Sequence, residues 1–137
     1  NASNLTWHQD SNPQHKSNPM VVIMAFLQNN AGDSRPGISI IDANTETFEG
    51  VYGYEGNRVD ELENKIIKDH GELRIQSPLT HAGDVILFNG LTFHRTFSNS
   101  KMTKHRDALL LRIVNPKHVA NFPSGPHLKT HERFFAN

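Results

Sequence analysis

The hydrophobic positions of this chain fall into short runs separated by polar, turn-rich segments. Residues 20–27 form a continuous apolar run, a pattern that predicts a strand buried on both faces. Further strands are predicted at residues 37–41, 72–76, 84–88, 91–97 and 107–114. Polar segments with Pro, Gly and Asn predict loops at residues 11–19, 28–36 and 42–56.

One helix is predicted among these strands. Over residues 57–70, Val59, Leu62, Ile66 and Ile67 fall near one helical face. Gly71 follows where a glycine commonly caps the C-terminus of a helix. We therefore expect an amphipathic helix that covers an apolar surface.

A hairpin is the best-specified supersecondary element. Asn89-Gly90 separates residues 84–88 from 91–97, and this dipeptide favours the type I′ turn of a two-residue hairpin. Strand alternation places His94 on a polar face together with Thr92 and Thr96. A histidine beside two hydroxyl groups suits a wet cavity better than a core.

Short strands, turn signals and a single helix predict a mainly β protein, built as an antiparallel sandwich or jelly roll. We expect one domain over residues 1–137, with a loosely packed, Pro-, His- and Lys-rich tail over residues 117–137. The motif described below starts near residue 1, earlier than in most jelly rolls. We therefore expect a segment of a longer domain, or an incomplete jelly roll completed by strands outside this sequence.

Composition narrows the chemistry. Lys plus Arg equals Asp plus Glu, at 14 each, so the formal net charge is zero and nothing suggests nucleic acid or an anionic membrane as partner. There is no cysteine, so a metal would be held by His and carboxylate groups. No apolar run approaches the ~18 residues of a membrane span, and no signal peptide is visible. We expect a cytoplasmic protein that acts on a small molecule, and the oligomeric state stays open.

The candidate chemistry begins with His8 and Asp10. In an extended chain these two side chains point the same way, and His94 could add a third ligand. Two His and one carboxylate occupy one face of an octahedral ion and leave the opposite face open, which suits a non-heme Fe(II). Twelve residues after His94, Arg106 offers a planar fork matched to a carboxylate. We interpret the set as the catalytic centre of an iron oxygenase that uses a 2-oxo acid.

With this spaced set, the sequence resembles the phytanoyl-CoA dioxygenase family of Fe(II)/2-oxoglutarate-dependent oxygenases. The family pattern runs His-x-Asp, a Gly-Asp-hydrophobic strand, a short turn, a His, and an Arg about a dozen residues later. The matching positions here are His8, Asp10, residues 83–88, His94 and Arg106, and the resemblance covers most of residues 5–116. It implies a double-stranded β-helix of the jelly-roll, cupin-like kind. It also implies iron held by His8, Asp10 and His94, and 2-oxoglutarate held by Arg106 and Thr96.

The resemblance further implies a dioxygenase that consumes 2-oxoglutarate and dioxygen and hydroxylates a C–H bond of a small organic substrate. Related halogenases have a small residue at the position of Asp10, so a carboxylate there favours hydroxylation. Two features depart from the family pattern. The long N-terminal region of the family is missing, and residues 40–45 lack the Gly-Ser-His stretch that often ends this segment. That segment helps to shape the substrate site, so the substrate is not predicted.

Each assignment has a plainer alternative. His8 and Asp10 could be a surface pair, Arg106 could pair with Asp107 or Asp84, and Thr96 could simply favour a strand. At the level of function, the alternatives are a metal-binding cupin that is not an oxygenase, such as an isomerase, and a metal-free jelly-roll binding module. Among the remaining residues, Trp7 is expected to be a packing residue, and His127 and His131 are expected to be tail residues rather than a second metal pair. Arg35 and Arg95 are expected to be solvated, with contact to an anionic substrate as the alternative. Tyr52 and Tyr54 either belong to a lid or anchor a loop.

Overall fold

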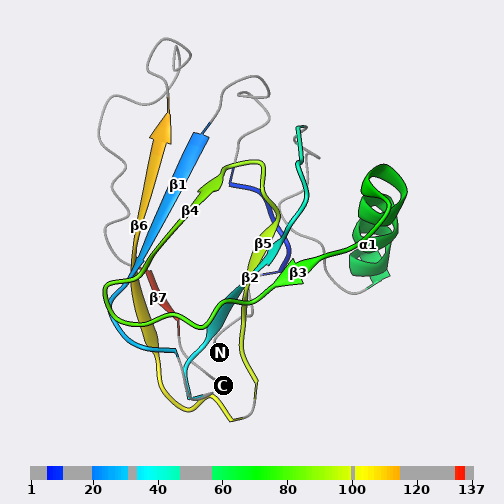
Figure 1. Cartoon of the computed structure of the whole chain (residues 1–137). Coiled ribbons are helices and arrows are strands. Elements are labelled where there is room, and N and C mark those ends of the chain that lie inside the picture. Colours follow the sequence, from blue (N-terminus) through cyan, green and yellow to red (C-terminus); the bar gives the residue numbers. More distant parts are fainter. Residues whose placement is uncertain are drawn as a thin grey trace.

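The computed structural model describes residues 6–10, 20–30, 34–46, 57–99, 101–114 and 132–134 (Figure 1). The elements in chain order are β1 (Met20–Phe26), β2 (Gly37–Ile41), α1 (Asn57–His70), β3 (Ile75–Gln76), β4 (Val85–Asn89), β5 (His94–Phe97), β6 (Arg106–Val114) and β7 (Glu132–Phe134). The predicted class, mainly β with one helix, is confirmed. Segments 11–19 and 47–56, with Tyr52 and Tyr54, lie outside the described residues, as do His127 and His131.

The strands form two antiparallel sheets, of order β4-β1-β6-β7 and β3-β2-β5. In the first sheet Val22 of β1 lies opposite Phe88 on one side and Arg112 on the other. In the second sheet Ile40 of β2 lies opposite His94 of β5. Within the described ranges the two sheets do not close into a barrel. Three residues of the predicted tail form β7, which pairs with Arg106–Ala108 of β6.

Two apolar clusters divide the molecule into layers. One lies between the sheets and consists of Met20, Val22, Met24, Phe26, Ile38, Ala108 and Leu110. The other lies between the second sheet and α1 and consists of Trp7, Ile41, Leu62, Ile66 and Phe93. Consequently α1 lies on the side of the second sheet that faces away from β1 and β6 (Figure 1). The side chains before and on β5 therefore alternate between the helix and the inter-sheet space.

The helix ends as its sequence predicts. Gly71 has a φ of +83°, and its N–H donates to the Ile67 carbonyl at 2.7 Å, which is the usual left-handed glycine cap. Leu62 and Ile66 are buried against the second sheet, whereas Ile67 is 44% exposed. The buried stripe is thus narrower than predicted. No helix in the described part of the chain is long and apolar enough to cross a membrane.

The predicted hairpin at Asn89-Gly90 is wrong, because β4 and β5 belong to different sheets. The Asn89 carbonyl accepts a hydrogen bond from the Thr92 N–H at 2.8 Å, so Asn89 is the first residue of a four-residue turn rather than a central one. Its side-chain oxygen accepts from the Leu91 N–H at 2.9 Å, as asparagine often does at the start of a turn. The turn carries the chain from one sheet to the other.

The prediction that β1 is buried on both faces is also wrong for the described residues. Its even-numbered side chains are buried between the sheets, whereas Val21 is 43% exposed and Ile23 is half-buried. The outer face continues over the exposed side chains of Val85 and Leu87. A continuous apolar run shows that the residues are suited to burial, but it does not show whether one or both faces of the strand are packed against other elements.

Candidate metal centre

A single backbone pairing brings two of the predicted ligands together. The His8 N–H donates to the His94 carbonyl at 3.1 Å, and the His94 N–H donates to the His8 carbonyl at 3.0 Å. Residues that exchange both hydrogen bonds in an antiparallel pair have side chains on the same face. The two imidazole rings accordingly lie side by side, with centroids 4.2 Å apart.

Asp10 joins them from two residues further along the same extended segment. Its Oδ1 lies 4.0 Å from His8 Nε2, and its Oδ2 lies 3.8 Å from His94 Nε2. One ligand atom from each of the three residues lies within 4.8 Å of the others. The Asp10 side chain is only 5% exposed, so the alternative of a surface pair does not hold.

A hydrogen bond at Nδ1 of each ring fixes the ring so that Nε2 faces the site. His8 Nδ1 lies 2.7 Å from the Thr6 carbonyl, and His94 Nδ1 lies 3.0 Å from the Thr92 carbonyl. Because a carbonyl only accepts, each Nδ1 carries a proton, so Nε2 is the ring nitrogen that offers a lone pair when the imidazole is neutral. A histidine that binds a metal is typically oriented by a hydrogen bond of this kind.

The charges of the site also suit a cation. Burial, together with the neighbouring His8, lowers the pKa of His94 to about 4, so this ring is neutral at pH 7. Burial alone would raise the pKa of Asp10, but the hydrogen bond from Arg112, together with its positive charge and the neighbouring histidines, outweighs burial and lowers that pKa. The site therefore offers a neutral imidazole beside a carboxylate anion.

The donor atoms of these three residues suit a metal ion. Asp10 Oδ2 is buried and has no hydrogen-bond partner among the described residues. Octahedral ligands at right angles lie roughly 3 Å apart, so ligand atoms that lie within 4.8 Å of one another would need to approach by about 1–2 Å. Two nitrogens and one carboxylate oxygen without a thiolate suit Fe(II) and Mn(II). The residues fit such an ion.

Arg106 faces the space between the sheets, on the same face of β6 as the buried Ala108 and Leu110. It is fully buried, and its Nη2 donates to Thr96 Oγ1 at 3.3 Å. Its guanidinium carbon lies 5.5 Å from the centre of the Phe26 ring. The carboxylate of Asp107 instead accepts a hydrogen bond from Gln28 at 2.8 Å. The alternative of Arg106 on the surface is therefore wrong.

The other residues considered from the sequence lie outside this site. Trp7 is fully buried beside Phe93, as expected of a packing residue. The Arg95 guanidinium stacks on the Trp7 ring at 4.4 Å, on the opposite face of β5 from His94. Arg35 donates to the His105 carbonyl. Neither arginine faces the three ligands.

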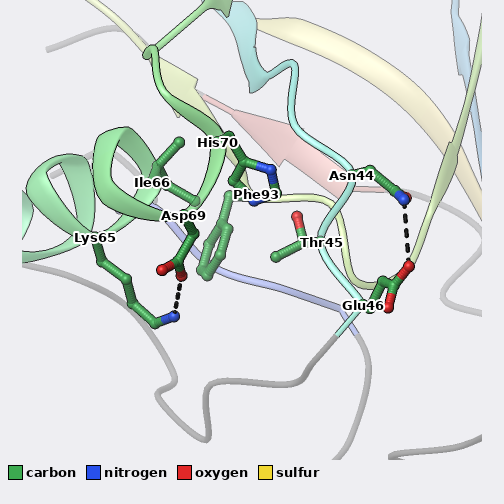
Figure 2. A pocket seen from close by; sticks show the side chains of 8 residues that line it. All are labelled: Asn44, Thr45, Glu46, Lys65, Ile66, Asp69, His70 and Phe93. Atoms are coloured by element: carbon green, nitrogen blue, oxygen red, sulfur yellow. Dashed lines mark hydrogen bonds and ion pairs between the residues drawn. The ribbon is translucent and has the colours of Figure 1, made fainter.

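Two pockets flank this region on opposite faces of the second sheet. One pocket, of about 340 Å³, lies between α1 and the segment after β2. Figure 2 shows Phe93 among its lining side chains and Lys65 paired to Asp69. The other pocket, of about 320 Å³, includes Ile40, Phe88 and Thr92 in its lining. The Phe88 ring lies 4.6 Å from that of His94, so this pocket, whose lining residues are more often apolar than polar, adjoins the candidate metal centre.

Sequence reasoning missed one residue at the site. Arg112 donates from Nη2 to Asp10 Oδ1 at 2.8 Å. The available signal was its position on the same strand face as Arg106, within an otherwise apolar run.

Comparison with known proteins finds no matching family model, no matching curated protein and no matching solved structure. Function must therefore be argued from the geometry of the site.

Proposed function

We propose that the protein is an Fe(II)- and 2-oxoglutarate-dependent dioxygenase, similar to the phytanoyl-CoA dioxygenase family, that hydroxylates a C–H bond of a small organic molecule. We further propose that its two sheets are parts of a double-stranded β-helix. One observation carries the proposal. A single strand, β5, presents His94 to the metal ligands and Thr96 to a buried arginine, on the same face.

The three ligands would hold the ion by one face. His8 and His94 would bind through Nε2, and Asp10 through Oδ2, which leaves three positions for a chelating co-substrate and dioxygen. When bound there, Fe(II) would allow decarboxylation of 2-oxoglutarate to succinate and carbon dioxide to be coupled to insertion of one oxygen atom into a C–H bond. The protein's part is to orient the two imidazoles, to keep that of His94 neutral and to keep the carboxylate ionised.

Arg106 would bind the far carboxylate of 2-oxoglutarate. Strand geometry separates His94 from Thr96 by roughly 7 Å, a span that suits a five-carbon diacid anchored at both ends. A guanidinium matches a carboxylate with two parallel hydrogen bonds, and burial strengthens such charge-assisted contacts. The Thr96 hydroxyl, which accepts from Arg106, could share the same carboxylate.

The pocket beside His94 supports an apolar group on the substrate. Ile40 and Phe88 contribute to its lining, and within the part of the chain that the structure describes no basic residue does. Its one acidic residue, Asp42, accepts a hydrogen bond from Gln76 at 2.7 Å. We propose that the carbon to be hydroxylated reaches the metal from this side.

The test is anaerobic titration of the protein with Fe(II) and then 2-oxoglutarate, recording the visible charge-transfer band of the chelate. The wild-type protein and His81→Ala, a control at an exposed histidine, should give the band. His94→Ala should not, because it removes a ligand. A protein that binds Fe(II) but gives no band with 2-oxoglutarate would favour a cupin that is not an oxygenase. A protein that binds no metal would favour a metal-free binding module.

A further inference from the structure

Asp10 has two carboxylate oxygens in different surroundings. Oδ2 is buried, has no hydrogen-bond partner within the described ranges, and faces His94. Oδ1 accepts a hydrogen bond of 2.8 Å from the Arg112 guanidinium. One oxygen is therefore held by the protein while the other is left for a cation.

Arg112 reaches Asp10 from the other sheet. It lies on β6 opposite Val22, which is fully buried between the sheets, so the arginine also points inward. Asp10 belongs to the segment that pairs with β5 in the second sheet. The contact thus joins the two sheets at the candidate metal centre. The Arg112 side chain is 35% exposed, so the contact lies at the solvent side of the site.

We propose that Arg112 is a positioning residue for the metal. By holding Oδ1, its guanidinium makes Asp10 bind through Oδ2 alone, and so preserves three open positions on the ion. A carboxylate without such a hydrogen bond can turn and bind through both oxygens, which would fill one of those positions. A bidentate co-substrate and dioxygen together need all three. This inference rests on the metal site of the proposed function.

The experiment counts the water molecules on a bound Mn(II) ion, with no co-substrate and no turnover. Mn(II) speeds the relaxation of water protons in proportion to the number of water molecules that it binds. Wild-type protein should show about three waters per bound ion, and Arg112→Gln about two, a fall of roughly one third. Arg112→Lys, which keeps a charged donor, should restore most of the wild-type value. Arg74→Gln, which removes an exposed arginine paired with Glu72, should leave it unchanged.

The outcomes separate this inference from the proposed function. If folded Arg112→Gln keeps the wild-type relaxation per bound ion, Arg112 only ties the sheets together and the inference is wrong. If Arg112→Gln does not fold, the wild-type count decides, because two waters there would mean that Asp10 binds through both oxygens despite Arg112. Failure of the wild-type protein to bind Mn(II) would refute the metal site itself. Normal water counts without a 2-oxoglutarate charge-transfer band would refute only the oxygenase assignment.

Discussion

Replacement of Arg106 by methionine tests the co-substrate assignment most directly. Metal-binding jelly rolls can share the same three ligands, so the ligands alone do not identify the co-substrate. Arg106 is fully buried next to Thr96 and Phe26. Methionine is unbranched and adaptable, so it can fill most of the vacated space without leaving a charge behind. Arg106→Met should therefore remove the carboxylate contact while retaining the fold.

The expected loss follows from the kind of contact. A charge-assisted, two-point hydrogen bond to a carboxylate contributes roughly 2–3 kcal/mol, so the affinity for 2-oxoglutarate should fall about 30- to 150-fold. Thr96→Val removes only a neutral hydroxyl, and a loss of about 1 kcal/mol should weaken binding about fivefold. Metal affinity should stay nearly unchanged in both variants, since neither residue is a ligand.

The assay is calorimetric titration of 2-oxoglutarate into the anaerobic, Fe(II)-loaded protein. Arg74→Met serves as the control, because it removes an arginine that is exposed at the surface. Circular dichroism must show that each variant is folded. If folded, metal-loaded Arg106→Met binds 2-oxoglutarate as tightly as the wild type, the oxygenase assignment loses its main support. A cupin that is not an oxygenase would then be the better interpretation.

Three further predictions concern the ligands and the core. His94→Ala should abolish Mn(II) binding by calorimetry while His105→Ala, at an exposed histidine, retains it; equal affinities would rule out the proposed ligand set. Without metal, the wild type should lose stability as the pH falls from about 6.5 to about 4. Over this range His94 becomes protonated in the unfolded chain, where its pKa is 6.5, but stays neutral in the folded protein, where its pKa is about 4. Urea unfolding should show a shallower pH dependence in His94→Gln, and identical slopes would contradict this reasoning. Ile66→Ala should cost about 2–5 kcal/mol of unfolding free energy and exposed Ile67→Ala under about 1 kcal/mol; similar losses would mean that α1 packs differently.

Local patterns predicted the elements well where one physical cause dominates. Apart from Asp107 and Arg112, residues 107–114 are apolar, and they nearly coincide with β6. The apolar stripe of residues 57–70, with its glycine cap, coincides with α1. Alternation also put His94 and Thr96 on one face, and both are buried there. Each of these inferences depends only on the period of a strand or helix.

Partner choice could not be predicted in the same way. The Asn89-Gly90 dipeptide is a local signal, whereas the pairing of β4 with β1 depends on residues sixty or more positions apart. Once β4 pairs with β1, the turn has to lead into the second sheet, and Asn89 is its first residue instead of a central one. The contact of Arg112 with Asp10 could not be predicted for the same reason, since Asp10 belongs to a segment paired with the other sheet.

The metal centre itself depends on a register that apolar packing sets. Trp7 points toward the helix and is fully buried beside Phe93. Because side chains alternate along an extended segment, His8 and Asp10 therefore face the inter-sheet side. A slip of one residue against β5 would turn every side chain of this segment to the opposite face. It would bury an imidazole against α1 and remove the indole from its apolar contacts with Phe93 and the helix, which is costly on both counts. The apolar contact beneath the helix therefore holds the ligands in place from the far side of the sheet.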